Sequence, residues 1–377
     1  MKIFFLSRGY PTDEYKLNGI FEMDQALELK RQGHDVVFLS LDMRSIRRKR
    51  KFGFKIFEVE GMKVYSYNIP IGAVPKRIYN FFLIRYAKRL FKKASKDYGM
   101  PDALLTMFTE QGYAASKIRQ EFNVPAILIE PNSIINKKEI DDYFYNLAYK
   151  TYHNLDRVIA VSPAFRDHLN EKFNIKSIYN PVLPSLELFF YKERENSEIF
   201  KIVSTGRISK LKGFRELILA FSEAFKDKKA SLEIFGGGPD EAYLKDLIAK
   251  ENMGDKIFLR GMQNRETIAK AYESSDLFVL LSHSETFGLV YLEALASGLP
   301  IIATRCSGPE HLVTDENGIL VDLFDHDKTV EALNYMYENY KKYDKRKISE
   351  DTKNNFSKKK ITDDLVEIMK EAVKDYA

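Results

Sequence analysis

The chain has 377 residues, which is too many for one ordinary domain and suits two domains that each bury a core. Its formal net charge of +5 at pH 7 gives no chain-wide attraction to a polyanion, and its single cysteine, Cys306, excludes an internal disulfide framework and a thiolate zinc cluster. No run approaches the roughly 20 apolar residues of a membrane span. Met1–Ser7 enters strand-like sequence without a signal peptide, so we expect a cytoplasmic protein.

The first half of the chain alternates strand-like and helix-like segments. A β-rich run at Lys2–Ser7 is followed by a loop that ends at Gly19, a helix that ends before Gly33, and a strand at Asp35–Ser40. This alternation predicts an α/β domain with a doubly wound parallel sheet. Further strands, each followed by helical sequence, are expected at Ala103–Phe108, Ala126–Glu130 and Arg157–Ser162.

Two stretches of the first half are strongly basic. Arg44–Lys55 and Lys76–Lys93 each carry seven Lys or Arg and no acidic residue, and the second interleaves them with aromatic and aliphatic residues at helical spacing. An amphipathic basic helix of this kind can lie in a membrane interface, so one expectation is peripheral contact with an anionic membrane at the inner face of the cell membrane. A solvated helix over an ordinary core is the alternative. No nucleic-acid motif accompanies the charge, so nucleic acid is not an expected partner.

The second half begins after a loosely patterned stretch between Asn180 and Ser197, where we expect the hinge. A strand ends at Thr205, and its loop supplies cations and glycines before a helix: Gly206, Arg207, Lys210, Lys212 and Gly213. Glycines let the backbone approach a diphosphate, which a guanidinium and an ammonium group can neutralise. Two further strand-and-loop segments follow, Leu232–Asp240 and Lys256–Met262.

The stretch Ser284–Pro300 is the most informative part of the sequence. An apolar run at Leu277–Leu281 predicts a buried strand, and a tight turn then leads into a helix that ends at Gly298. The first N–H groups of such a helix suit a phosphate. Glu285 and Glu293 bracket the turn, and carboxylates can accept hydrogen bonds from vicinal sugar hydroxyls. Alternatively, Glu285 flanks the helix and Glu293 lies on a solvated face.

The end of the chain gives weaker signals. Cys306 has no assigned base and is interpreted as incidental, and Asp325–Asp327 precedes a helix, where an aspartate is an N-cap more often than a metal ligand. We therefore expect no metal and no cofactor. A break is expected near Lys341–Asn355, followed by a helix from Phe356.

Two glutamates separated by seven residues, with Phe287 and Gly288 between them, resemble the donor-site motif of retaining GT-B glycosyltransferases, specifically glycosyltransferase family 4. Gly206-Arg207 and Lys212-Gly213, four residues apart, resemble the diphosphate clamp of that family, and Glu310 fits its later acidic position. The resemblance implies a GT-B fold, with two Rossmann-like doubly wound domains facing across a cleft. It implies an acceptor domain at 1–183, a donor domain at 184–355 and a final helix at 356–377 that crosses back to the first domain.

The resemblance also implies the roles of individual residues. Those expected to act in catalysis are Arg207, Lys212 and Glu285. Those expected to bind the donor are Gly19, Gly206, Gly237, Met262, Phe287, Gly288, Leu289 and Glu293. The family often places histidines in two loops of the first domain that here contain Glu110, Glu130 and Asn132, so acceptor contacts are expected from Glu110 and Asn132, and no catalytic histidine can be assigned.

The implied activity is transfer of a sugar from a nucleotide diphosphate sugar, a UDP-sugar being favoured over a GDP-sugar, to a hydroxyl of a saccharide or lipid-linked acceptor in cell-envelope polysaccharide synthesis. Two alternatives stay open. One is a GT-B nucleotide-sugar 2-epimerase, which needs more acids and histidines in the first domain. The other is a non-catalytic donor-binding or partner subunit, which is expected to lack the clamp residues.

Overall fold

The computed structural model describes residues 1–47, 50–137, 139–193 and 197–376. Positions 48 and 49 of the first basic stretch, 194–196 of the expected hinge and 377 of the expected final helix lie outside the described residues. The chain divides into two compact units. Unit 1 comprises Met1–Leu183 together with the chain from Lys358 onward, and unit 2 comprises Pro184–Ser357.

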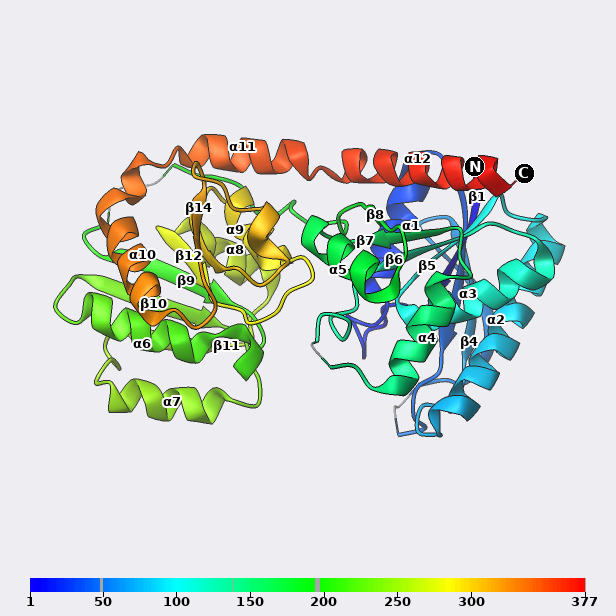
Figure 1. Ribbon diagram of the computed structural model, residues 1–377, viewed down its shortest axis with the longest axis horizontal. Helices are drawn as coiled ribbons and strands as arrows, with labels where there is room; N and C mark the ends of the chain where they lie inside the picture. Colours follow the sequence, from blue (N-terminus) through cyan, green and yellow to red (C-terminus); the bar gives the residue numbers. More distant parts are fainter. Residues whose placement is uncertain (48–49, 138, 194–196, 377) are drawn as a thin grey trace. The chain divides into compact units, whose positions relative to one another are not determined.

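Unit 1 is built on an eight-stranded sheet of order β3-β4-β2-β1-β5-β6-β7-β8 (Figure 1). All pairings between its described strands are parallel except that of β3 with β4. The strand order reverses between β1 and β5, where the carboxyl ends of a doubly wound sheet leave room for a ligand. Its elements are β1 (Lys2–Ser7), α1 (Ile20–Arg31), β2 (Asp35–Asp42), β3 (Gly53–Val59), β4 (Met62–Asn68), α2 (Lys76–Tyr98), β5 (Ala103–Met107), α3 (Thr109–Phe122), β6 (Ala126–Glu130), α4 (Asp142–Tyr152), β7 (Arg157–Ala160), α5 (Pro163–Phe173), β8 (Ile178–Tyr179) and α12 (Lys358–Tyr376).

Helix α2 uses most of its apolar face inside unit 1. Leu83, Leu90 and Phe91 are buried in one core with Phe4 and Leu6 of β1. The aromatic residues of this helix therefore mainly support the sheet, as the alternative of an ordinary core predicts. Only the first turns present large apolar side chains to solvent, Ile78 at 46% and Phe81 at 61% exposure.

Helix α12 belongs to unit 1 although unit 2 precedes it in the chain. It packs against α1 and buries Ile361, Leu365 and Met369. The side chain of Asn180 donates a hydrogen bond to the Ile361 carbonyl at 3.2 Å. These contacts join the end of the chain to the rest of unit 1. The helix begins at Lys358, two residues later than expected from the sequence.

Unit 2 is built on a six-stranded parallel sheet of order β11-β10-β9-β12-β13-β14. Its strand order reverses between β9 and β12. Its elements are β9 (Phe200–Thr205), the 3₁₀ turn η1 (Lys210–Lys212), α6 (Phe214–Phe225), β10 (Ala230–Phe235), α7 (Glu241–Lys250), β11 (Ile257–Gly261), α8 (Arg265–Glu273), β12 (Leu277–Leu280), α9 (Leu289–Ala296), β13 (Ile301–Thr304), η2 (Pro309–His311), β14 (Gly318–Val321), α10 (His326–Asn339), η3 (Tyr340–Lys342) and α11 (Lys345–Asn355).

The predicted break over Lys341–Asn355 is wrong, because most of this stretch forms α11. The Asp344 carboxylate accepts a hydrogen bond from the Lys347 N–H at 3.0 Å and so caps the helix. Ile348 and Thr352 are buried, and α11 packs against α9. Lysines and asparagines on the exposed side hide this narrow buried stripe in the sequence.

The two sheets match the expected fold class of two Rossmann-like α/β domains. Among the residues that the structure describes, none of the helices combines the length and the apolar character needed to cross a bilayer.

Candidate active site

The loops that follow β9 and β12 meet at the point where the strand order of unit 2 reverses. The ammonium group of Lys212, in the first loop, forms an ion pair with the carboxylate of Glu285, in the second. The Ser282 hydroxyl donates to the same carboxylate at 3.0 Å. Open α/β sheets bind ligands at this position, beyond the carboxyl ends of the strands. The sequence predicted both charged residues, and the structure brings them into contact.

Gly213 allows the two loops to touch backbone to backbone. Its φ is +64°, and a Cβ atom at this position would lie 1.9 Å from the carbonyl oxygen of Leu281. The His283 N–H donates to the Leu211 carbonyl at 2.8 Å across the same contact. A side chain at residue 213 would force the loops apart and move Lys212 away from Glu285.

Helix α9 begins next to this ion pair. Gly288 is its N-cap residue, with a φ of +98°, and no side chain caps the helix. The helix is held in place by Tyr291, whose hydroxyl donates to the Leu280 carbonyl at 2.9 Å, while Phe287 is buried before the first turn. Leu289 is the first helical residue. The uncapped N–H groups give this end partial positive charge that suits an anion.

Glu293 is not on a solvated helix face, as the alternative held, because its side chain is mostly buried. The carboxylate forms an ion pair with the Arg265 guanidinium at 2.8 Å, and Arg265 also donates to the Ser185 carbonyl at 2.6 Å. Burial raises the pKa of Glu293 to about 7, and the charge of Arg265 opposes that change. No local pattern points to Arg265, since the partner of a buried carboxylate depends on how separate elements pack.

The loops after β9, β10 and β11 also lie together. The Gly206 N–H donates to the Phe235 carbonyl at 3.0 Å, and a Cβ atom on Gly237 would lie 3.0 Å from the Cγ atom of Met262. Met262 is exposed, so this loop is open to solvent. Arg207 is also exposed and forms no ion pair with any described residue. Its guanidinium is therefore available to a ligand.

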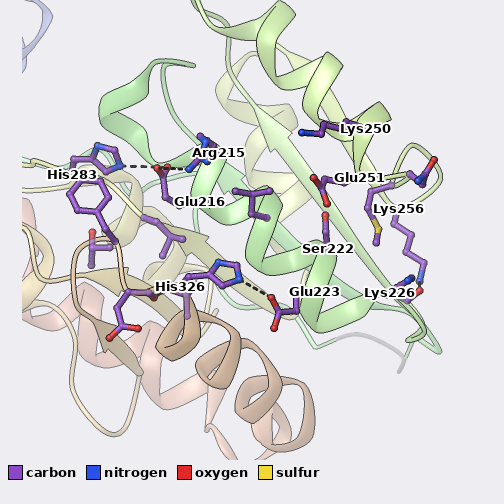
Figure 2. A pocket seen from close by; sticks show the side chains of 18 of the residues that line it. Arg215, Glu216, Ser222, Glu223, Lys226, Lys250, Glu251, Lys256, His283 and His326 are labelled. Carbon is purple, nitrogen blue, oxygen red and sulfur yellow. Dashed lines mark hydrogen bonds and ion pairs between the residues drawn. The ribbon is translucent and has the colours of Figure 1, made fainter.

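A large hollow of about 880 Å³ in unit 2 lies elsewhere, along α6 (Figure 2). Two histidines on its wall pair with carboxylates of α6: His283 lies 3.5 Å from Glu216 and His326 lies 2.8 Å from Glu223. Lys212, Glu285 and Glu293 do not line this hollow. It is therefore distinct from the site formed by the predicted residues.

In unit 1, Gly19 and Glu110 follow the two strands between which the order reverses. Gly19 has a φ of +69°, and a Cβ atom there would lie 2.4 Å from the Gly9 carbonyl oxygen, so the loop folds back on itself. Glu110 lies in the first turn of α3 and is half-buried. The Arg8 guanidinium, which the sequence analysis missed, lies 3.6 Å from the centre of the Phe108 ring and pairs with the buried Glu22 at 3.0 Å. Arg8 joins the ends of β1 and β5.

Asn132 lies in the loop after β6, where it supports a buried acid. Its backbone N–H donates to the Glu130 carboxylate at 3.0 Å, and its side chain accepts from the Ile134 N–H at 3.1 Å. Glu130 is fully buried and also accepts from the hydroxyls of Thr109 at 2.6 Å and Tyr152 at 2.9 Å. Burial raises the pKa of Glu130 to about 7, against the effect of these hydrogen bonds. This network stiffens the loop that carries Asn132.

Among the described residues, no three His, Cys, Asp or Glu side chains are grouped to hold a metal ion. The Asp325 carboxylate accepts from the Lys328 N–H at 2.9 Å, so it caps α10, as expected. Cys306 is buried, and burial raises the pKa of its thiol to about 12, which makes it a poor nucleophile. Glu310 accepts from the Ser307 N–H at 2.7 Å and closes the loop beside Glu285.

Two doubly wound α/β units with a charged site at the strand-order reversal of the second define the GT-B class of glycosyltransferases. The solved structure of sucrose-phosphate synthase from Thermosynechococcus elongatus has this fold: it superposes with a TM-score of 0.78 at 18% identity, over 98% of this chain and 99% of that protein. Residues 23–185 match the profile described as Glycosyltransferase Family 4, and residues 187–354 match that described as Glycosyl transferases group 1.

Two relatives match most of the chain. The GDP-mannose-dependent alpha-mannosyltransferase of Corynebacterium glutamicum is 31% identical over 329 residues, covering 81% of this chain and 73% of that protein. The alpha-monoglucosyldiacylglycerol synthase of Streptococcus pneumoniae is 25% identical over 345 residues, covering 82% and 73%. Matches to several other relatives cover between 35% and 55% of those proteins. The chain belongs to glycosyltransferase family 4, the group 1 glycosyl transferases, and is a glycosyltransferase.

Proposed function

We propose that the protein transfers a sugar from a nucleotide diphosphate sugar to a hydroxyl group of a saccharide or lipid-linked acceptor, with retention of the anomeric configuration. The observation that carries this proposal is the pairing of Lys212 with Glu285 beside the uncapped start of α9. A cation, a carboxylate and a helix N-terminus without a side-chain cap are together what a sugar diphosphate needs, because it joins two negative phosphates to a ring of hydroxyls.

In the proposed mechanism, Lys212, Arg207 and the first N–H groups of α9 hold the diphosphate of the donor. Negative charge grows on this group as the bond to the sugar breaks, and donors that are already in position stabilise that charge in the transition state. Glu285 fixes the ammonium group of Lys212 and accepts hydrogen bonds from the sugar. The departing phosphate assists removal of the acceptor proton on the same face, so the mechanism needs no metal and no cofactor.

Glu293 is proposed to bind the two hydroxyls of the ribose. Its carboxylate uses Oε1 for Arg265, and a carboxylate has further lone pairs that can accept from a ligand. Gly206, Gly237 and Met262 would then surround the base and the diphosphate, and Gly19 is proposed as a further donor contact. Arg265 acts as a positioning residue that holds Glu293 in its buried place.

For the nucleotide we propose uridine diphosphate over guanosine diphosphate, although the alpha-mannosyltransferase relative is named for GDP-mannose. The test is thermal unfolding of the protein with UDP, GDP and ADP in turn. A ligand at 100 times its dissociation constant stabilises a protein by about 2.7 kcal/mol. Glu293→Ala should abolish most of this shift, whereas Glu338→Ala, an exposed change on α10, should keep it. If none of the three nucleotides shifts the unfolding temperature, the proposal fails.

For the acceptor we propose a saccharide or lipid-linked acceptor of cell-envelope polysaccharide synthesis, contacted by Glu110 and Asn132. The name of the streptococcal relative contains a lipid, which supports the lipid-linked alternative. We also propose a cytoplasmic location with peripheral contact to anionic membrane through the start of α2, where Ile78 and Phe81 are exposed among cations. Vesicle co-sedimentation should show a preference for anionic lipid that Phe81→Ser weakens. Equal binding to neutral vesicles would exclude this contact.

A further inference from the structure

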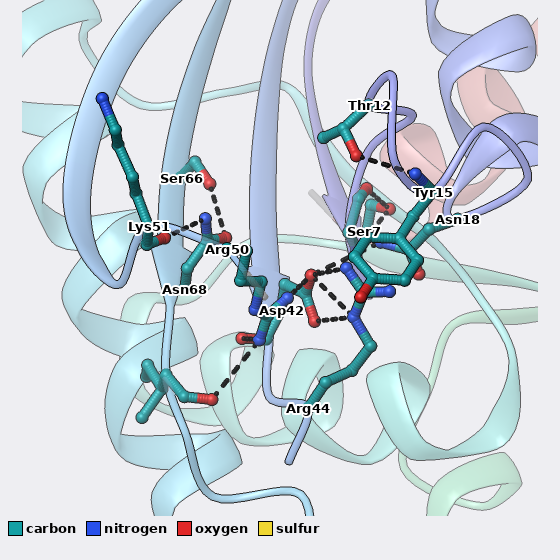
Figure 3. Close-up of polar contacts among 12 residues, drawn as sticks. Ser7, Thr12, Tyr15, Asn18, Asp42, Arg44, Arg50, Lys51, Ser66 and Asn68 are labelled. Carbon is teal, nitrogen blue, oxygen red and sulfur yellow. Dashed lines mark hydrogen bonds and ion pairs between the residues drawn. The ribbon is translucent and has the colours of Figure 1, made fainter. Parts of the chain in front are cut away.

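A second hollow, of about 570 Å³, lies in unit 1 beside the loop that leads to Gly19. It is found at the carboxyl ends of β2 and β4, the edge of the sheet at which ligands bind. Figure 3 shows the carboxylate of Asp42, the last residue of β2, among the polar contacts of this region. The side chains that decide its chemistry are Tyr10, Tyr15, Asp42, Arg44, Arg50 and Lys55.

Two guanidinium groups share the single carboxylate of Asp42. Arg44 donates from Nε and Nη2 to the two carboxylate oxygens, at distances between 2.7 and 3.0 Å. Arg50 pairs with the same carboxylate and donates from Nη2 to the Asp42 carbonyl at 2.8 Å. One carboxylate balances only one of these two charges, so the cluster carries one positive charge in excess.

This excess charge is largely removed from water. The side chains of Asp42 and Arg50 are only 4% and 7% exposed, and Nε of Arg50 has no hydrogen-bond partner among the described residues. Two buried cations that share one carboxylate are not fully neutralised, and an anionic ligand would supply the missing negative charge. Asp13 and Glu14 also line the hollow, but both are exposed and neither forms an ion pair with a described residue.

Aromatic rings support the cations of the hollow. The Arg44 guanidinium lies 4.3 Å from the centre of the Tyr15 ring, and the Lys55 ammonium lies 4.8 Å from that of Tyr10. Lys55 comes from β3, so the edge strand adds a further positive charge to the same hollow. Counting all lining residues, four cations face three carboxylates.

The hollow is joined to the loop that contains the proposed donor contact in unit 1. The Asn18 amide lies 3.5 Å from the Asp42 carboxylate, and Asn18 directly precedes Gly19. A group bound by the two arginines would therefore lie beside the loop that the reaction uses.

A purely structural role explains only one of the arginines. Arg50 donates to backbone carbonyls and so holds its own loop against the sheet. The hydrogen bonds of the Arg44 side chain go to Asp42. Because Arg50 already neutralises that carboxylate, the charge of Arg44 is not needed for the fold. We propose that this hollow binds the phosphate group of a phosphorylated acceptor, with Arg44 and Arg50 as the donors. This inference rests on the proposed function, because it assigns the chemical class of the acceptor.

The test measures phosphate binding by titration calorimetry on the full chain, with saturating UDP present so that the diphosphate site of unit 2 is filled. The probes are inorganic phosphate, a hexose 6-phosphate, and phosphatidylcholine vesicles with and without phosphatidic acid. Arg44→Gln should weaken binding about tenfold or more, since it removes charge-assisted hydrogen bonds. Arg44→Lys should lose less. Arg47→Gln is the matched control, because it makes the same charge change at an exposed position of the same segment.

Arg44-dependent binding of the hexose phosphate would identify a soluble acceptor, and Arg44-dependent binding of the phosphatidic acid vesicles alone would identify a lipid. Equal affinities of Arg44→Gln and Arg47→Gln, or no binding of any probe by the wild type, would overturn the inference. The proposed function is judged separately by the nucleotide shift, which Arg44→Gln should leave unchanged. If no nucleotide binds, the same titrations are carried out without UDP, and they still compare the phosphate affinities of Arg44→Gln and Arg47→Gln.

Discussion

Lys212 and Glu285, 73 positions apart in the chain, form an ion pair between the two loops at the strand-order reversal of unit 2. The pair holds the ammonium group beside the first turn of α9 before any ligand arrives. In the proposed reaction, this cation therefore needs no further side-chain ordering when negative charge develops on the donor. The pair also makes both residues depend on the backbone contact at Gly213.

Replacing Lys212 by alanine should lower kcat by about 100- to 1,000-fold, the usual cost of removing one positioned donor from a developing negative charge. The measurement is release of nucleotide diphosphate in the presence of donor and acceptor. Lys210→Ala, an exposed change in the same 3₁₀ turn, should retain nearly full activity. If the protein acts within a complex with a second glycosyltransferase and Lys212→Ala leaves the transfer rate of that complex unchanged, the protein is a non-catalytic subunit.

Nucleotide binding should strengthen as the pH rises through about 7, because burial raises the pKa of Glu293 to that value. Above it the group is a carboxylate, which accepts hydrogen bonds from ribose hydroxyls at both oxygens, whereas the protonated form accepts them less well. The measurement is the dissociation constant of UDP across this pH range. Glu293→Gln should show only the pH dependence of the nucleotide itself. Identical profiles for the two proteins would exclude Glu293 from the site.

Gly213→Ala should destabilise unit 2 by more than about 2 kcal/mol, since it combines a left-handed backbone with a clash against the Leu281 carbonyl. The measurement is the thermal unfolding midpoint, together with activity below it. Gly254→Ala is the control, because no atom lies within 4 Å of a Cβ at that position. A variant as stable and active as Gly254→Ala would show that the two loops can separate without harm.

Glu130→Gln should make the stability of unit 1 less sensitive to pH. The pKa of the buried carboxyl is about 7 in the folded protein and 4.5 when exposed, so the folded state retains a proton that the unfolded state releases between these values. Stability is therefore greatest at the acidic end of this window and falls as the pH rises through 7, by up to about 3 kcal/mol.

The glutamine variant keeps an acceptor for Thr109 and Tyr152 but cannot ionise. Between about pH 5 and pH 8, the unfolding temperature of the wild type should fall relative to that of this variant. Glu171→Gln, an exposed change on α5, should follow the wild type. Parallel curves for all three proteins would show that Glu130 does not carry the pH dependence.

The alternation of apolar runs and helical spacing predicted most of the parallel strands, because a buried strand needs a continuous apolar segment. It missed the hairpin of β3 and β4, although Glu60 and Gly61 form a tight turn with positive φ between two β-rich runs. The basic residues around Arg50 led to this stretch being interpreted as a charged segment and not as a strand. In addition, β3 is an exposed edge strand without a buried face, so it lacks the strict apolar alternation of a half-buried strand.

The sequence points to the residues of the proposed donor site because each carries chemistry in its own motif. It does not point to the partners of buried acids: Arg265 reaches Glu293 from another helix, and Arg8 reaches Glu22 from the end of β1. Such pairs arise from packing between elements, for which local spacing gives no signal. The apolar residues of α2 were likewise ambiguous until the core of unit 1 had been located.

Helix α12 follows unit 2 in the chain but completes unit 1, which precedes unit 2. During synthesis, the α1 surface that will cover Ile361, Leu365 and Met369 stays open until all of unit 2 has been translated. Domains tend to fold as they emerge from the ribosome, so unit 1 folds first without α12, and the apolar surface that α12 later covers stays exposed. A nascent chain stalled after unit 2 would be the species most in need of a chaperone.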